Sequence, residues 1–449
     1  MTRKRSKWSS QFQDKNGVQL VEESADKYNG VPSMCLFFGS HYKFHVLTVL
    51  AVAAIGIAVA VFITNFKILS IFKIYVQLNH IDDGFVKEDA IKMSQVLQGT
   101  SGDSNIVQLS HKAENQESFL SQGGGNFQKL SCSGKQKGSC GKVDKRQKLS
   151  LQEFHNRYDG KWPVIVTDVM SSWPAINWTA DFFKNKYGKR RVTMTTFANS
   201  VKSGFSVPLK IFLEHLHMSS PRAWTYLQDE MFLIQHPELR EDVLQTVYME
   251  EDLFKLLPSA VRPWDCMLLW GTAHSRSSLH IDPYNWTGTN AVISGHKLWK
   301  LLPPGQDNLL SVRPGMRCGF PLECVKYNSD LDLFDPAQQD RHTQLKFLEA
   351  EQGPGEIIFI PPGWFHQAYN EVPTLAVSGQ MMNSNNYHIV LEEIFKGGSL
   401  KRSSLPENFG LMTPREAVAA MAARISQHVL EEGVRRTEEA IQQLYMPQP

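Results

Sequence analysis

The chain has 449 residues and a formal net charge of +2, because 47 Lys and Arg nearly balance 45 Asp and Glu. A protein that coats nucleic acid needs a clear basic excess, so this balance excludes that role for the chain as a whole, and we expect no direct nucleic-acid partner. The contents of 22 Pro, 30 Gly and 6 Cys exclude collagen, a coiled-coil rod and a disulfide-dense mini-protein. At roughly 150 residues per domain, the length allows two or three domains.

An uncharged apolar stretch follows a basic N-terminal tail, residues 1–43. Residues 44–66 read FHVLTVLAVAAIGIAVAVFITNF, 23 residues without Asp, Glu, Lys or Arg. As a helix this stretch is about 34 Å long, which is enough to cross a hydrocarbon core of about 30 Å. We therefore expect one transmembrane helix. The alternative is a buried core helix, whereas a signal peptide begins earlier and has a shorter apolar stretch.

The basic residues that flank this stretch predict its orientation. Over the longer flanks the N-terminal side holds more Lys and Arg than the C-terminal side, which favours a cytoplasmic N-terminus and a lumenal remainder. We expect a single-pass membrane protein of the endoplasmic reticulum or Golgi with a lumenal catalytic domain. A cytosol-facing domain is the alternative, and the last residues, YMPQP, are not a KDEL-type retention signal.

Residues 67–148 are expected to form a juxtamembrane segment and a stalk. From residue 99 onward the chain is rich in Ser, Gly, Gln and Lys and poor in large apolar residues, a composition typical of disorder. The Lys-rich run at 135–148 is either solvated or contacts acidic partners or lipid headgroups. Cys132 and Cys140 lie in this segment and could close a small disulfide loop in an oxidising lumen.

The folded part is expected to begin near Leu149. Phe154 and Tyr158 suit a short amphipathic helix, and residues 163–169, PVIVTDV, are typical of a buried strand. Helices are expected around residues 180–187, 209–217 and 250–257. Short apolar runs separated by Gly, Pro and Asn then predict strands: CMLLWG, TGTNAVIS, KLWKLLPP, GEIIFIPP and TLAVSGQM. Strands at such spacing predict a mainly β sandwich or barrel with an appended helical part.

The C-terminal segment, residues 404–449, is expected to be helical. Thr413 and Glu416 form a capping-box pattern around Pro414. An apolar stripe follows at spacings of four: Ala417, Met421, Ile425 and Val429. This stripe packs either on its own domain or on a second subunit, so a homodimer through the C-terminal helices is one of two interpretations.

Three polar residues beside predicted strands could hold a metal. His280 and Asp282 are two residues apart, so on a strand both side chains point to the same face, and His366 follows a Pro-Pro-Gly turn after another strand. Two imidazoles and one carboxylate form the facial triad of non-haem Fe(II) oxygenases. Zinc accepts the same ligands, so the triad alone does not distinguish redox from hydrolytic chemistry.

Lys297 lies on the next apolar strand, 15 residues beyond Asp282. A buried ammonium is costly without an anionic partner, so we expect Lys297 to bind a carboxylate of an organic acid that chelates the metal. The alternative is a Lys that extends to solvent. Tyr284 and Trp286 either shape the mouth of the site or only pack beside the strand.

The string HIDPYNWTGTNAVISGHKLWKLLPPG, followed by GPGEIIFIPPGWFHQAYN, resembles the Jumonji-C family of Fe(II) and 2-oxoglutarate dioxygenases, especially its protein-hydroxylase and arginine-demethylase-like branch. The segment PVIVTDVMSSWPAINWTADFFKNKYG resembles the start of the cupin module of that family. The resemblance runs from about Leu149 to Met382. It implies a double-stranded β-helix, or jelly roll, as the catalytic domain over residues 149–396.

The resemblance also implies roles for individual residues. By position, His280, Asp282 and His366 match the iron ligands, and Lys297 matches the group that binds the distal carboxylate of 2-oxoglutarate. Further positions match residues around the co-substrate: Asn290, Ser277, Tyr226, Ser378 and Gln380. Three of these differ from the commoner family residues, since Ser277 and Ser378 stand for Thr and Gln380 stands for Asn.

The implied activity is hydroxylation of a protein side chain, coupled to oxidative decarboxylation of 2-oxoglutarate to succinate and CO₂. Fe(II), 2-oxoglutarate and O₂ are the implied cofactors and co-substrates, and ascorbate is expected to support turnover. N-methyl-lysine or N-methyl-arginine demethylation is the alternative within the family, and a non-catalytic cupin binding module is the alternative outside it. The substrate is not determined, because substrate grooves in this family differ in loops such as residues 305–344.

Overall fold

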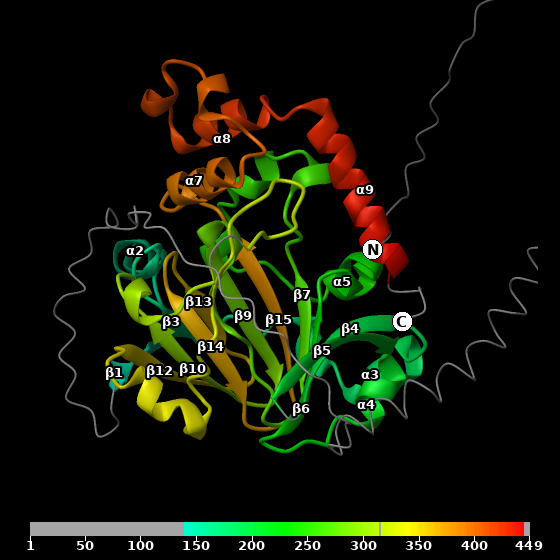
Figure 1. The fold of residues 1–449 in the computed structure, drawn as a ribbon. Coiled ribbons are helices and arrows are strands. Elements are labelled where there is room, and N and C mark those ends of the chain that lie inside the picture. Colours follow the sequence, from blue (N-terminus) through cyan, green and yellow to red (C-terminus); the bar gives the residue numbers. More distant parts are fainter. Residues whose placement is uncertain (1–138, 199, 314–315, 444–449) are drawn as a thin grey trace, which may run out of the picture. The chain divides into compact units, whose positions relative to one another are not determined.

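The computed structural model describes residues 139–198, 200–313 and 316–443, and this part of the chain is mainly β (Figure 1). Its strands form two sheets. One has six strands in the order β1-β12-β10-β14-β8-β11, and the other has nine in the order β2-β3-β13-β9-β15-β7-β6-β4-β5. Most neighbours are antiparallel, whereas β1 is parallel to β12 and β2 is parallel to β3.

The strands are β1 Ser139–Lys142, β2 Asp144–Arg146, β3 Val164–Val166, β4 Arg191–Ala198, β5 Val201–Pro208, β6 Ala223–Asp229, β7 Met267–Gly271, β8 Leu279–Ile281, β9 Thr287–Ser294, β10 Lys297–Leu302, β11 Tyr327–Ser329, β12 Phe347–Gln352, β13 Ile357–Ile360, β14 Phe365–Asn370 and β15 Thr374–Met381. The α-helices are α2 Leu151–Glu153, α3 Ala180–Tyr187, α4 Leu209–Glu214, α5 Phe232–Gln235, α6 Pro237–Arg240, α7 Tyr387–Gly397, α8 Pro414–Ala422 and α9 Gln427–Gln443. Shorter helical turns are the π turn Phe154–Tyr158 and the 3-10 turns Pro174–Asn177, Val247–Met249, Leu253–Leu256, Ser259–Val261, Pro283–Asn285, Asp307–Leu309, Pro336–His342, Arg402–Ser404 and Phe409–Leu411.

Strands β7 to β10 alternate between the two sheets, and so do strands β12 to β15. β8, β10, β12 and β14 belong to the six-stranded sheet, whereas β9, β13 and β15 belong to the nine-stranded sheet. This alternation is typical of a jelly roll, so the mainly β, cupin-like architecture with helical additions is confirmed. β9 is buried from Thr287 to Ile293 on both faces, which explains why its sequence is a continuous run of apolar and small residues rather than an alternation.

The largest apolar cluster lies between the nine-stranded sheet and helices α3 and α4. Phe183 of α3 is fully buried, and its ring meets Trp270 of β7 edge to face at 5.4 Å. α3 begins at Thr179, whose hydroxyl accepts a hydrogen bond from the amide of Phe182, and it spans the predicted range. The helix predicted over 250–257 is instead a 3-10 turn between Leu253 and Leu256.

The folded part begins before Leu149, inside the segment predicted to be a disordered stalk. β2 pairs with β3 and β1 pairs with β12. Polar side chains dominate both strands, and main-chain pairing and surface ion pairs such as Lys145 with Glu356 hold them in place. The polar composition of β1 and β2 therefore led to the incorrect prediction that this segment is a disordered stalk. Of the predicted disulfide pair, Cys140 is disulfide-bonded and Cys132 lies outside the described residues.

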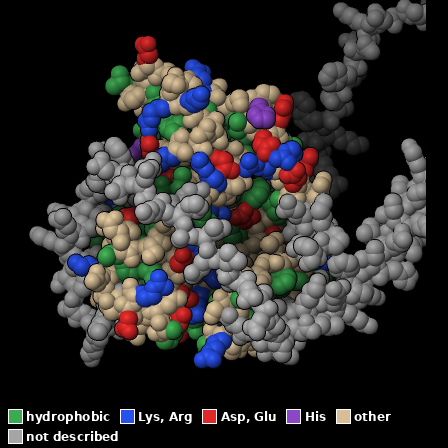
Figure 2. All heavy atoms as spheres, in the orientation of Figure 1, with side chains coloured by type: hydrophobic (Ala, Val, Ile, Leu, Met, Phe, Trp, Pro, Cys, Tyr) green, Lys and Arg blue, Asp and Glu red, His purple; other side chains and the backbone are tan. Residues whose placement is uncertain are grey.

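The predicted localisation as a single-pass membrane protein is contradicted. Within the described ranges, no helix combines the length and the apolar character needed to cross a bilayer. The longest of the helices described, α9, has 17 residues and carries Glu and Arg side chains, which are mixed over its surface in Figure 2. The span predicted for residues 44–66 lies outside the described residues.

The C-terminal helices pack on their own domain. The capping box of Thr413 and Glu416 is present at the start of α8. Ala417 and Met421 are buried in a cluster with residues of α7, and Ile425 and Val429 pack against the same cluster. α7, α8 and α9 lie together at one end of the sheets (Figure 1). Of the two partners expected for the apolar stripe, the domain itself is the one observed.

Met421→Ala tests this packing. Met421 is fully buried, and truncating it should lower the free energy of unfolding by about 2–5 kcal/mol because a cavity remains. Leu411→Ala is the control, because Leu411 is 90% exposed and should change stability by less than about 0.5 kcal/mol. Urea unfolding at two protein concentrations measures both. Equal losses for the two variants, or a midpoint that rises with concentration, would contradict packing within one chain.

Candidate active site

Two histidines and one aspartate converge beside the six-stranded sheet. His366 of β14 lies directly opposite His280 of β8, and their ring centroids are 4.4 Å apart. Asp282 follows β8, and its Oδ1 atom is 3.6 Å from Nε2 of each histidine. In the described part of the chain, this is the cluster whose potential metal-ligand atoms all lie within 4.8 Å of one another. The three residues predicted as metal ligands therefore come together.

Backbone carbonyls orient both imidazole rings. Nδ1 of His280 is 2.8 Å from the carbonyl oxygen of Ser278, and Nδ1 of His366 is 3.0 Å from that of Trp364. A carbonyl oxygen can only accept, so each Nδ1 carries the proton and donates it. Each Nε2 is then left with its lone pair, directed toward Asp282. In metal-bound histidines the ring nitrogen that does not bind the metal usually donates such a hydrogen bond, here from Nδ1 to a backbone carbonyl.

A tight turn and a glycine position the carboxylate of Asp282. β8 ends at Ile281, and the next turn contains Tyr284 and Asn285, both with φ of +53°. The amide of Asn285 donates to the carbonyl of Asp282 at 3.0 Å. Gly288 at the start of β9 faces the carboxylate so closely that a Cβ atom there would lie 1.9 Å from Oδ2 of Asp282. Only glycine leaves room for the carboxylate in this position.

The charges in this cluster suit a divalent metal. Burial lowers the pKa of His366 to about 4, so its ring is neutral at pH 7. Burial by itself would raise the pKa of Asp282, but His366 and His280 outweigh it and the pKa lies below its usual value. Burial likewise acts to lower the pKa of His280, but Asp282 outweighs it and raises the pKa. Two imidazole nitrogens and one carboxylate are donors that Fe(II) accepts, with further positions left open.

A cavity of about 360 Å³ opens beside the cluster. Its lining includes the three candidate ligands and most of the predicted co-substrate residues: Tyr226, Ser277, Asn290, Ser378 and Gln380. Lys297 is fully buried next to it, and its Nζ donates a hydrogen bond to the hydroxyl of Tyr226 at 3.0 Å. Among the residues that the structure describes, no carboxylate pairs with Lys297. A buried ammonium in this state favours an anionic ligand.

The other polar side chains of the cavity differ in whether they already form hydrogen bonds within the protein. The hydroxyl of Ser277 accepts from the amide of Ala368 at 3.0 Å, and that of Ser378 donates to the carbonyl of Thr289 at 3.0 Å. The side-chain amide of Gln380 donates to a backbone carbonyl. Oδ1 of Asn290 is buried and has no hydrogen-bond partner within the described residues. Asn290 is therefore the side chain whose bonding capacity a ligand would complete.

Aromatic rings close another side of the cavity. Trp286 lines it together with Trp264 and Phe320, whereas Tyr284 is buried and stacks on Phe320. Of the two aromatic residues considered from the sequence, Trp286 shapes the mouth and Tyr284 packs behind it. Sequence reasoning missed Gly288, Trp264 and Phe320. Gly288 lies in the predicted strand TGTNAVIS, whereas the two aromatic residues lie in connections outside the motif and carry no local signal.

Comparison with known proteins now identifies the family. A sequence model described as a cupin-like domain matches residues 150–390, more than half of the chain. The chain belongs to this family. It is 30% identical over 268 residues to Lysine-specific demethylase JMJ21 of Arabidopsis thaliana, a match that covers 57% of this chain and 27% of that protein. The Jumonji-C group of Fe(II) and 2-oxoglutarate oxygenases, expected from the motifs, is thereby confirmed as its family.

Two further relatives carry names that state different activities. Bifunctional arginine demethylase and lysyl-hydroxylase psr-1 of Caenorhabditis elegans is 28% identical over 258 residues, covering 56% of this chain and 63% of the relative. 2-oxoglutarate and iron-dependent oxygenase JMJD4 of Danio rerio is 28% identical over 198 residues, covering 41% and 44%. The match therefore spans less than two thirds of each of these relatives.

Gly288→Ala tests the positioning of Asp282. The added methyl group would displace the carboxylate, and we expect binding of Mn(II), a redox-stable substitute for Fe(II), to weaken by about 10- to 100-fold. Gly204→Ala is the control, because nothing lies within 4 Å of a Cβ atom at that position. Calorimetric titration with Mn(II) measures both. If Gly288→Ala binds Mn(II) as tightly as Gly204→Ala, Asp282 does not act as a ligand in the position described.

Proposed function

We propose that this cupin-like domain binds Fe(II) and 2-oxoglutarate and hydroxylates a side chain of a protein substrate. The observation that carries the proposal is the fully buried Lys297, which has no carboxylate partner in the described part of the chain and is separated from His366 by the ring of Trp299. An organic diacid that chelates the metal at one end would supply the missing anion at the other. The name of the JMJD4 relative, a 2-oxoglutarate and iron-dependent oxygenase, supports the same cofactors.

Trp299 separates the two ends of the proposed co-substrate site. Lys297 and Trp299 lie two residues apart on β10, so their side chains share one face. Nζ of Lys297 is 5.8 Å from the ring centroid of Trp299, and that ring is 6.1 Å from the ring of His366. The ammonium is therefore set apart from the metal ligands by one aromatic ring, a separation that suits a short diacid better than a single carboxylate.

Two groups of residues would bind the metal and the co-substrate. His280, Asp282 and His366 would hold the metal from one side, and Lys297 with Tyr226 would bind the distal carboxylate of 2-oxoglutarate. When bound, Fe(II), 2-oxoglutarate and O₂ supply the oxidising chemistry, in which one oxygen atom enters the substrate C–H bond and the other enters succinate as CO₂ leaves. The buried walls of the cavity exclude water and fix the reacting groups in place.

Demethylation is the second candidate, because relatives are named as lysine-specific and arginine demethylases. The same hydroxylation on an N-methyl carbon gives a carbinolamine, which breaks down to the amine and formaldehyde. The two candidates therefore differ in product rather than in site. A hydroxylase leaves an added oxygen atom on the peptide, whereas a demethylase removes a methyl group and releases formaldehyde.

Turnover by the full-length chain tests the proposal. With Fe(II), 2-oxoglutarate, ascorbate and peptides that contain a central Lys or Arg, unmodified or N-methylated, we expect succinate release and a change in peptide mass. His280→Ala should abolish both. His388→Ala should not, because His388 lies on α7 outside the cluster. A wild-type chain that releases no more succinate than His280→Ala with any peptide would leave a non-catalytic binding module as the better interpretation.

Lys297→Met tests the co-substrate assignment separately. A charge-assisted hydrogen bond contributes about 1.5–3 kcal/mol, so its loss should weaken 2-oxoglutarate binding by about 10- to 100-fold. Lys300→Met is the matched control on the same strand, since Nζ of Lys300 donates to the carbonyl of Leu333 instead. Calorimetry with the Mn(II)-loaded chain measures the affinity without turnover. Equal affinities in the two variants would show that Lys297 does not bind the carboxylate.

A further inference from the structure

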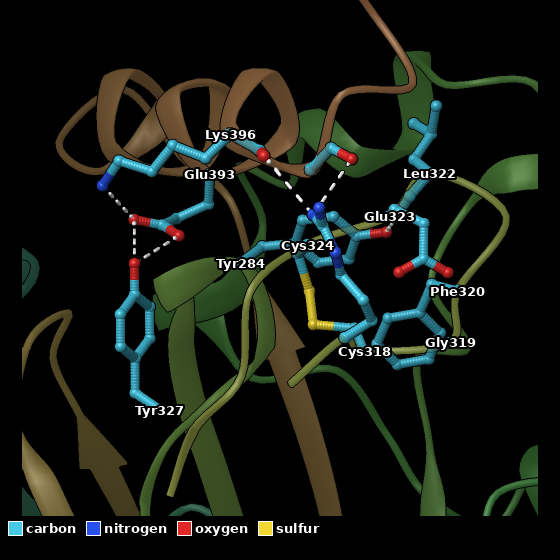
Figure 3. Close-up of a disulfide and its surroundings, with 12 residues drawn as sticks. Tyr284, Cys318, Gly319, Phe320, Leu322, Glu323, Cys324, Tyr327, Glu393 and Lys396 are labelled. Carbon is cyan, nitrogen blue, oxygen red and sulfur yellow. Dashed lines mark hydrogen bonds and ion pairs between the residues drawn. A yellow bond between two sulfur atoms is a disulfide. The ribbon is translucent and has the colours of Figure 1, made fainter. Parts of the chain in front are cut away.

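A loop closed by a disulfide forms part of the cavity wall. Cys318 and Cys324 are bonded, with their Cα atoms 5.2 Å apart, and they enclose a short loop within the connection between β10 and β11 (Figure 3). Cys318, Gly319 and Phe320 line the same cavity as the candidate metal ligands. We call residues 318–324 the disulfide loop.

Phe320 connects the disulfide loop to the turn that carries Asp282. Its ring stacks on Tyr284 with centroids 5.6 Å apart and an interplanar angle of 15°. The hydroxyl of Tyr284 donates to the carbonyl of Leu322 within the loop. The Phe320 ring also contacts Trp286 and Trp264, each at 6.2 Å between centroids. Trp264, Trp286 and Phe320 thus form one aromatic wall of the cavity.

The C-terminal helix α9 holds the disulfide loop from outside. Nη1 of Arg436 donates to the carbonyls of Gly319 and Phe320 at 3.2 and 3.1 Å, and it pairs with Glu323 at 2.9 Å. One guanidinium therefore binds three groups of a short loop. Arg436 also pairs with Glu432 of its own helix, whereas the neighbouring Arg435 pairs with Glu432 and Glu439 of that helix.

The end of α7 packs against the same loop. A Cβ atom at Gly397 would lie 1.7 Å from the carbonyl oxygen of Glu323, so only glycine permits this approach of the two backbones. The amide of Glu323 also donates to the hydroxyl of Ser399 at 3.0 Å. The disulfide loop is therefore restrained from three directions: by its own disulfide, by the end of α7 and by α9.

The lining of the cavity also includes polar residues. Gln228, Glu230, Lys326 and Asn328 line it. Over the ranges that the structure describes, the side chains of Glu230 and Lys326 make no hydrogen bond or ion pair. A substrate side chain with an apolar stem and a polar end would place the stem on the aromatic wall and its end among these groups.

We propose that Phe320 is a specificity-determining residue that contacts the apolar stem of the substrate side chain, and that Arg436 and the Cys318–Cys324 disulfide are positioning residues that hold Phe320 against the turn of Asp282. The inference rests on the proposed function and adds the C-terminal helix to the substrate site. A chain with a mobile disulfide loop would keep its metal and 2-oxoglutarate sites but bind substrate less well.

Hydrogen exchange in the full-length chain tests the positioning role without any turnover. Arg436→Gln should speed amide exchange in residues 318–324 by about tenfold, because the loop loses bonds to α9. Arg435→Gln should leave the loop unchanged, and Arg436→Lys should restore part of the protection as a single donor. A Cys318→Ser/Cys324→Ser double variant should also speed exchange. Equal exchange in Arg436→Gln and Arg435→Gln would overturn the positioning role.

Peptide kinetics test the specificity role. Among the Lys and Arg peptides described above, we expect Phe320→Ala to raise the KM for the peptide by about tenfold, with the kcat and the KM for 2-oxoglutarate nearly unchanged. Arg436→Gln should shift the KM for the peptide in the same direction. Phe334→Ala is the matched control, a half-buried Phe between β11 and β12 that stacks on Tyr369 and does not line the cavity.

The outcomes separate this inference from the proposed function. An active wild-type chain whose Phe320→Ala variant keeps the KM for the peptide, or loses affinity for 2-oxoglutarate equally, would overturn the specificity role and leave the proposed function intact. A wild-type chain that turns over no peptide would overturn the proposed function and the specificity role together. The exchange experiment would then still decide whether Arg436 positions the loop.

Discussion

The direct pairing of β8 with β14 is the constraint on which the site depends. It sets His366 opposite His280, and because side chains alternate along a strand, a slip of one residue would turn one imidazole to the other face of the sheet. The carbonyls of Ser278 and Trp364 then fix which nitrogen of each ring is free. Gly288 of the opposite sheet leaves the space that Asp282 occupies. The convergence of these three side chains thus follows from the strand register and from the absence of a side chain at Gly288.

Burial of polar groups connects the metal cluster to the rest of the cavity. Lys297 and Asn290 are both placed where water does not reach, and within the described residues neither finds all the partners that its chemistry allows. Such groups are costly in a folded chain unless a ligand completes them. The disulfide loop differs, since Arg436 of α9 binds two of its carbonyls and one carboxylate oxygen of Glu323. Lys297 and Asn290 therefore present polar groups to a ligand, whereas contacts with α9 hold the disulfide loop in place.

Much of the fold could be predicted from sequence because its signals are local. The five apolar runs are strands β7, β9, β10, β13 and β15, and the capping box begins α8. β1 and β2 were missed because polar strands at a sheet edge depend on main-chain pairing, which composition does not reveal. The membrane localisation was inferred from residues 44–66, and the helices of the described part do not support it.

The sequence by itself determined the types of the candidate ligands and the strands that carry them, because a two-residue spacing and an apolar run have local physical meaning. Only the tertiary structure decided which residues meet. It brought His366 to His280 across 86 positions, set Tyr226 against Lys297, and bound Arg436 to the backbone of Phe320, which lines the cavity. Contacts between segments far apart in the chain depend on sheet register and loop packing, and no short motif encodes either of these.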